Sequence, residues 1–160
     1  MDDKKSTPTM QHGIGTKEVR FAPITRGEYR RYIGSGDIIL DEPGYLVEYL
    51  DGSKANHPNH KGYISWSPQE VFDNAYRPTL CMTFGLAIEA MKRGYRVART
   101  GWNGKGMFVL YCDEGPAYPI TDGRVYARLP YIYMKTSDDK LVPWLASQTD
   151  MLADDWVVVS

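Results

Sequence analysis

The sequence lacks the features by which several large classes of protein identify themselves. Only two of its 160 residues are cysteine, and its 19 basic side chains nearly cancel its 20 acidic ones. Proteins that follow a nucleic-acid backbone without sequence preference normally carry a clear basic excess, so we expect neither DNA nor RNA as a partner. No apolar run approaches the roughly 20 residues that span a bilayer, so we expect no membrane partner.

The residues that serve most often in metal sites and catalysis do not combine into a recognisable set. Cys81 and Cys112 are typical of two free thiols in a cytosolic protein, with one disulfide in a secreted protein as the alternative. His57 and His60 form an H-x-x-H pair in a polar loop, but no second cluster completes four zinc ligands. Nucleophilic catalysis needs a base beside Ser, Cys or Thr, and no such pairing is evident. The sequence therefore predicts no catalytic residue, no metal and no cofactor.

What is present is enough for a folded core and indicates two small modules. Apolar residues make up 42% of the chain and aromatic residues 12%. Pro78 ends one helical pattern, and a new periodic pattern starts just after it. We therefore expect a flexible tail over residues 1–14, an N-terminal α+β module of unknown role over 15–77, and a second module over 80–160.

Strand patterns outnumber helical ones in both modules, which predicts an α+β fold with antiparallel sheet and a few short helices. Thr25 and Glu28 have the spacing of a capping box, and Thr83 is the expected N-cap of the helix that Gly94 ends. Strands are expected over residues 18–24, 44–50, 62–66, 95–99, 107–111, 130–135, 141–144 and 156–159. Helices are expected to end at Tyr32 and to start near residues 67–70, 83 and 147.

The stretch KRGYRVARTGWNGK over residues 92–105 holds five basic residues and no acidic one. A solvated strand edge is the plain structural interpretation, because lysine and arginine discourage edge pairing. The functional interpretation rests on its end, where glycines around Trp102 let backbone N–H groups approach an anion. Lys105 adds a charge, and the indole offers a face on which a base can stack. The glycines do not follow the P-loop spacing, which argues against a nucleoside triphosphatase.

A second polar and aromatic stretch covers residues 143–150, PWLASQTD. Trp144 is either ordinary core or a second stacking surface. The polar residues after it stand at an expected helix start, where backbone N–H groups also favour anions. Asn103 and Gln148 have side chains that can read the edge of a purine, and both are equally suited to turns and caps.

From about Met82 to Val159 the chain resembles a family of phage proteins, the second type of Thoeris anti-defence protein. Three blocks carry the resemblance in the family's order: MTFGLAIEAMKRGYRVARTGWNGKGMFV, LPYIYMKT and LVPWLASQTDMLADDW. They cover about half of the chain. The N-terminal blocks TRGEYRRYIG and GYLVEYLDG…GYISWSP resemble a phage-borne extension that accompanies this family.

The resemblance implies a molecular sponge that is not an enzyme. Members of this family bind cyclic ADP-ribose isomers made by bacterial TIR-domain enzymes and hold them without degrading them, in the cytoplasm of the infected host. They form homotetramers with ligand pockets at subunit interfaces, and some capture cyclic di- or trinucleotides as well. The alternatives are a phosphodiesterase-like enzyme that degrades the same signals and a structural or interaction module of the phage.

Carried over by motif, Trp102 is the first candidate for stacking on a base and Trp144 the second. The other candidate ligand-binding residues occupy matching positions of the same motifs: Phe84, Asn103, Gly104, Lys105, Gln148, Thr149 and Asp150. The segment EGPAYPITDGRVYARL is longer than in the shortest members of the family. We expect it to reshape or cover a pocket, which leaves the ligand open.

Overall fold

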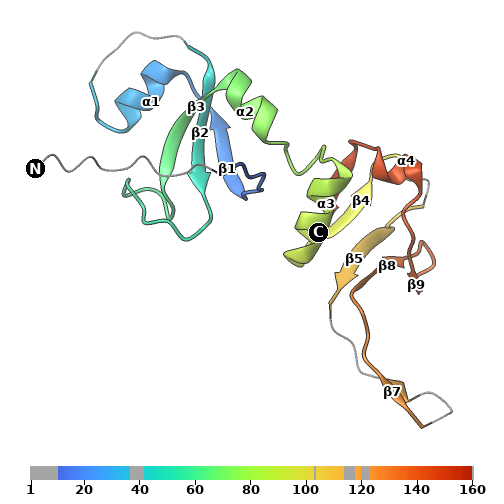
Figure 1. The fold of residues 1–160 in the computed structure, drawn as a ribbon. Coiled ribbons are helices and arrows are strands. Elements are labelled where there is room, and N and C mark those ends of the chain that lie inside the picture. Colours follow the sequence, from blue (N-terminus) through green and yellow to red (C-terminus); the bar gives the residue numbers. More distant parts are fainter. Residues whose placement is uncertain (1–10, 37–41, 103, 114–117, 120–122, 160) are drawn as a thin grey trace, which may run out of the picture. The chain divides into compact units, whose positions relative to one another are not determined.

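The structure is a computed structural model that describes residues 11–36, 42–102, 104–113, 118–119 and 123–159. The chain divides into two compact units, Met1–Phe72 and Asp73–Ser160, and each is described here by itself (Figure 1). The division lies before the Arg77-Pro78-Thr79 segment at which the sequence places its boundary. Of the expected tail, residues 1–10 lie outside the described residues.

The N-terminal unit is built on a three-stranded antiparallel meander. Its strands are β1 (Val19–Pro23), β2 (Gly44–Tyr49) and β3 (Ile64–Pro68), in that order across the sheet. Helix α1 (Arg26–Tyr32) follows β1, and α2 (Gln69–Ala75) follows β3. The expected capping box is confirmed, because Thr25 and Glu28 exchange side-chain and backbone hydrogen bonds at the start of α1.

Alternation along the strands gives the meander two different faces. Val47 and Ile64 are fully buried, one on each face. Phe72 of α2 covers the face of Val47 and packs against Phe21 and Tyr45, with ring centroids 4.7 Å and 4.4 Å away. Helix α2 is thus held by one buried aromatic residue, which explains why a helix of seven residues is stable here.

The C-terminal unit is a five-stranded antiparallel sheet with the order β10-β4-β5-β8-β9. The strands are β4 (Arg96–Arg99), β5 (Phe108–Cys112), β8 (Tyr131–Lys135), β9 (Leu141–Pro143) and β10 (Trp156–Val159). Two helices accompany it, α3 (Phe84–Lys92) and α4 (Gln148–Met151). Strands β6 (Tyr118–Pro119) and β7 (Val125–Tyr126), in the long segment that the sequence singles out, pair with each other as a separate hairpin. The antiparallel α+β class predicted from the sequence is confirmed.

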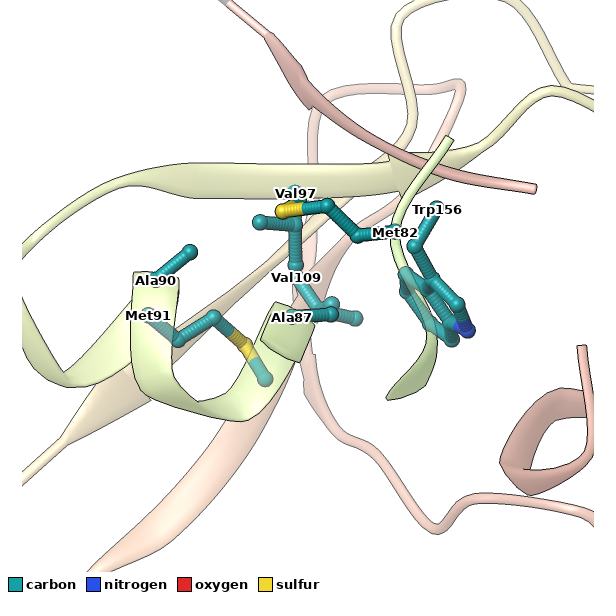
Figure 2. Packing of buried hydrophobic residues seen from close by; sticks show 7 residues of the cluster. All are labelled: Met82, Ala87, Ala90, Met91, Val97, Val109 and Trp156. Atoms are coloured by element: carbon teal, nitrogen blue, oxygen red, sulfur yellow. The ribbon is translucent and has the colours of Figure 1, made fainter. Parts of the chain in front are cut away.

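Helix α3 packs on strands β10, β4 and β5 of this sheet and closes the core. The helix begins at its N-cap Thr83 and ends before Gly94, which takes a positive φ of 89°. The core consists of Met82, Ala87, Ala90, Met91, Val97, Val109 and Trp156, whose side chains Figure 2 shows. Trp156, fully buried, is the largest of them. In the described part of the chain, no helix has the length and apolar character needed to cross a membrane.

Candidate functional site

The glycine-rich turn that the sequence singles out joins β4 to β5 in the C-terminal unit. The carboxylate of Asp155, one residue before β10, accepts hydrogen bonds from the Gly101 N–H at 3.0 Å and from the Thr100 hydroxyl at 3.2 Å. The Trp102 N–H donates to the Arg99 carbonyl at 3.2 Å. The start of the turn is therefore fixed to two strands, and Trp102 leaves it at a defined position. Asn103 lies outside the described residues.

Trp102 belongs to an aromatic cluster that consists of Phe84, Trp102, Trp144 and Trp156. Its indole meets Trp156 and Trp144 edge to face, with centroids 5.4 Å and 6.0 Å away. Phe84 packs against Trp156 at 5.3 Å and against Trp144 at 6.2 Å. Trp102, Trp144 and Phe84 are half-buried and pack against the core. The structure thus brings three of the predicted site residues together, and part of each ring remains accessible.

Asp150 joins this cluster to helix α4 by hydrogen bonds from both of its carboxylate oxygens. Oδ1 accepts from the Trp102 indole N–H at 3.4 Å and from Arg99 at 3.0 Å. Oδ2 accepts from the Ser147 N–H at 3.1 Å and from its hydroxyl at 2.6 Å. The Asp150 carbonyl accepts from the indole N–H of Trp156 at 3.0 Å. Asp150 therefore orients two of the tryptophans.

Arg99 is the cation at the centre of this network. Its guanidinium donates to Asp155 at 2.7 Å and to Asp150 at 3.0 Å. The bond from Arg99 lowers the pKa of Asp155 below its ordinary value. Burial raises the pKa of Asp150, but bonds from Ser147 and Arg99 outweigh it and the net pKa is lowered. Both carboxylates are therefore ionised at neutral pH, and Arg99 is held by them.

The anion site expected at the start of α4 is occupied by the protein itself, which corrects that expectation. Ser147 and Asp150 form a capping box, so backbone donors of this end already have partners within the chain. Helix α4 spans four residues only. Gln148 and Thr149 are exposed on it, and the Thr149 hydroxyl lies 2.8 Å from that of Ser147. These two side chains remain accessible to a ligand.

The second half of the turn is close-packed on the β8–β9 hairpin. A Cβ on Gly104 would overlap the Met107 side chain and lie 3.4 Å from Cβ of Ser137, so glycine serves close packing here. The Lys135 ammonium donates to the Gly106 carbonyl at 3.2 Å. Lys105 is exposed. The structure places Lys105 on the same turn as Trp102 but not in the aromatic cluster.

Sequence reasoning missed Arg99, Asp155 and Trp156 as parts of this site. Asp155 holds the turn through its carboxylate. No local spacing connects these residues, because the antiparallel pairing of β4 with β10 sets Arg99 opposite Trp156. β10 is apolar at all four positions, WVVV, so its sequence indicates a buried strand but does not tell which side chains point into the core.

The described residues contain no group of three or more His, Cys, Asp or Glu that is placed to hold a metal ion. No disulfide joins Cys81 and Cys112. Around the aromatic cluster the described residues offer ring faces, hydroxyl and amide groups, and an exposed ammonium.

Comparison with known proteins identifies the unit that carries this site. Residues 82–159 match the family model described as the Thoeris anti-defense 2-like domain. The chain is 41% identical over 87 residues to Thoeris anti-defense 2 of Bacillus phage SP01. This aligned stretch covers 49% of this chain and 96% of the relative. Nearly the whole length of the relative is thus matched by this chain. The family model matches only the C-terminal unit, from residue 82 onward. The chain belongs to the Thoeris anti-defense 2-like family.

Proposed function

We propose that the C-terminal unit binds a cyclic nucleotide immune signal and sequesters it without cleaving it, so that the protein blocks Thoeris defence in the cytoplasm of the infected bacterium. The observation that carries this proposal is the family membership, with 41% identity to a phage protein named for its action against Thoeris. Cyclic ADP-ribose isomers are the proposed ligands, and cyclic di- or trinucleotides are the second class.

The geometry of the aromatic cluster supports this role. Trp102 is oriented by its bond to Asp150 and by two edge-to-face contacts, so its exposed part is a preorganised surface for a base. Stacking contributes about 1–3 kcal/mol per base, whereas nanomolar capture requires about 12 kcal/mol. Further contacts to phosphates and base edges must supply the difference. Lys105, Gln148 and Thr149 are the exposed polar residues that we assign to those contacts.

A second copy of the chain is the proposed means of enclosing the ligand, in an assembly that we propose to be a homotetramer. Three leucines close in sequence to Trp144 and helix α4 are exposed to solvent: Leu145 is 92% exposed, Leu152 84% and Leu141 65%. Leu145 and Leu152 flank helix α4, on which Gln148 and Thr149 lie. We assign these exposed side chains to the contact with the second copy, because apolar surface that is open to solvent in one chain is what subunit interfaces bury.

Ligand-dependent stabilisation tests the proposal. A panel of cyclic ADP-ribose isomers and cyclic dinucleotides is added to the purified protein, and thermal unfolding is followed. Ligand at 100 times its Kd stabilises the folded state by about 2.7 kcal/mol, which is readily detected. Trp102→Ala is expected to abolish this shift, and Trp102→Phe to retain part of it because a ring face remains. A panel without any shift contradicts the proposal.

Recovery of the ligand separates capture from hydrolysis. The complex is heat-denatured and the released nucleotide is identified by mass spectrometry. Intact nucleotide is expected from a sponge, and a cleaved product would identify a phosphodiesterase instead. An interaction module of the phage particle would give neither a shift nor bound nucleotide.

A further inference from the structure

The N-terminal unit holds a cluster of titratable side chains that the proposed function does not use. Tyr32 is the last residue of α1, Glu48 lies on β2, and His57 and His60 lie in the connection between β2 and β3. These residues are far apart in the sequence and meet where the connection crosses the end of α1. The cluster lies wholly within the N-terminal unit.

Three of these side chains form a chain of polar contacts. The Tyr32 hydroxyl lies 2.8 Å from Nε2 of His60, and Nδ1 of His60 lies 3.4 Å from Oε2 of Glu48. Glu48 is 6% exposed, and its Oε1 accepts hydrogen bonds from the backbone N–H groups of Lys61 and Gly62 at 2.9 Å and 3.1 Å. The carboxylate is therefore fixed in place beneath the imidazole.

The surroundings determine which atoms of this chain carry protons. Bonds from the Gly62 N–H above all, together with His60, lower the pKa of Glu48, although burial opposes them. Glu48 is thus ionised at neutral pH and only accepts hydrogen bonds, so Nδ1 of His60 carries the proton that faces it. Nε2 of neutral His60 is then an acceptor, and the Tyr32 hydroxyl donates to it. The order carboxylate, imidazole, hydroxyl is that of an activated nucleophile.

The connection that carries His60 is held rigidly. The Asn56 side chain accepts from the Ile64 N–H and donates to the Ile64 carbonyl, both at 2.8 Å, which ties the connection to β3. His57 stacks on the Tyr32 ring with centroids 4.5 Å apart and an interplanar angle of 25°. The phenol is therefore fixed in orientation, while Tyr32 as a whole remains 39% exposed and open to a reactant.

We propose that Tyr32 is a nucleophile of the N-terminal unit, activated by His60 and Glu48, and that its reactant is a phosphoryl compound. In the step, Oη of Tyr32 forms a bond to phosphorus, Nε2 of His60 takes the phenolic proton, and the bond from phosphorus to the leaving group breaks. The leaving group departs with the electron pair of that bond. The product is a tyrosine phosphoester, and the imidazolium is stabilised by the carboxylate of Glu48.

The basic residues near Tyr32 along the chain guide the choice of reactant. Arg30 and Arg31 precede Tyr32 in the last turn of α1, and Lys61 follows His60. Hydrogen bonds from Thr25 lower the pKa of Glu28 most, and Arg31 also lowers it. Glu48, the buried carboxylate of this cluster, is turned toward its backbone donors and His60. Phosphoryl groups are matched by arginine and lysine, which is why we assign this class rather than an acyl donor.

A fluorophosphonate probe tests the inference on the full chain, because attack on its phosphorus releases fluoride and leaves a stable label. Peptide mass spectrometry gives the labelling rate at each tyrosine. Tyr63, which is 45% exposed, is the internal control. We expect Tyr32 to react at least about tenfold faster than Tyr63, at the low end of what a positioned general base contributes.

Two variants separate proton transfer from a merely structural role. His60→Gln is expected to lower the rate at Tyr32 to that at Tyr63, and His57→Gln, which removes the stacked ring but not the base, is expected to leave Tyr32 the faster of the two. Equal loss in both variants overturns the inference. An equal labelling rate at Tyr32 and Tyr63 in the unaltered chain also overturns the inference. This second test does not depend on whether His60→Gln folds. None of these outcomes bears on nucleotide capture by the C-terminal unit.

Discussion

Replacing Arg99 by glutamine is the sharpest test of how the C-terminal unit is held together. The substitution removes the cation that hydrogen-bonds both Asp150 and Asp155 and leaves a shorter, neutral amide side chain. Through these two residues Arg99 connects β4 with α4 and with the start of β10. The glycine-rich turn and Trp102 depend on the same two carboxylates.

The loss of stability expected from Arg99→Gln follows from how far the three charged side chains are buried. The side chains of Arg99, Asp150 and Asp155 are 20%, 14% and 28% exposed, so the pair is largely but not fully removed from water. Removal of one partner of a fully buried pair costs about 3–5 kcal/mol, and a charge-assisted hydrogen bond contributes about 1.5–3 kcal/mol. We expect Arg99→Gln to lower the free energy of unfolding by about 2–3 kcal/mol. For a unit of this size that is a fall in Tm of roughly 10–20 °C.

The pH dependence of stability gives an independent check with a defined sign. Asp150 and Asp155 have pKa values below the ordinary 3.8 in the folded state. Their contribution to stability is therefore fully present above about pH 4 and is lost as the pH falls through the lowered values. In Arg99→Gln both pKa values rise toward 3.8, so the loss of stability below pH 4 becomes shallower.

Urea unfolding followed by hydrogen exchange in peptides from β4 and β5 measures these effects within the C-terminal unit. Arg96→Gln is the matched control: Arg96 is an exposed residue on the same strand, with its guanidinium 5.3 Å from the Phe108 ring centroid. Its loss is expected to cost no more than about 1 kcal/mol. If Arg99→Gln costs no more than Arg96→Gln, the network does not hold the unit together as we argue.

Three further results are expected. Gly85→Ala, in the first turn of α3 with no described atom closer than 4.0 Å to the added Cβ, should stabilise the C-terminal unit by about 0.5–1 kcal/mol in urea unfolding. Gly62→Ala, whose Cβ would overlap the Tyr49 carbonyl oxygen, should destabilise the N-terminal unit by about 3 kcal/mol. Bonds from Ser53 first of all lower the pKa of Asp51 to about 2, and Ser53→Ala should raise it in an NMR titration; an unchanged value would contradict the assigned cause.

Local patterns were sufficient to predict most of the elements. The capping box at Thr25 and the N-cap at Thr83 are confirmed, and the helix expected to start near residue 147 begins with a capping box at Ser147. These features depend on residues three or four positions apart, so their energetics are contained in the sequence itself. The turn between β8 and β9 is also local, and in it Asp139 takes a positive φ of 61°, which aspartate adopts more readily than most residues.

The candidate site could be predicted only in part. Trp102, Trp144, Phe84 and Asp150 were identified as members of a site, and the structure brings them into contact. The contacts among these residues were not predictable from the sequence. Trp102 was expected to offer a stacking face, and in the structure it also packs against the core. Gly104 was expected to serve an anion, which stays a prediction, and the structure adds that a Cβ at this position would overlap Met107.

The sequence by itself determined the class of fold, the places where helices start, and the motifs that identify the family, since each depends on neighbours along the chain. Only the tertiary structure decided which charges meet. Arg99 finds Asp155 through the pairing of two strands, and Tyr32 finds His60 where a long connection crosses a helix end. Contacts of this kind depend on strand register and on packing between elements, and no spacing within a single segment records them.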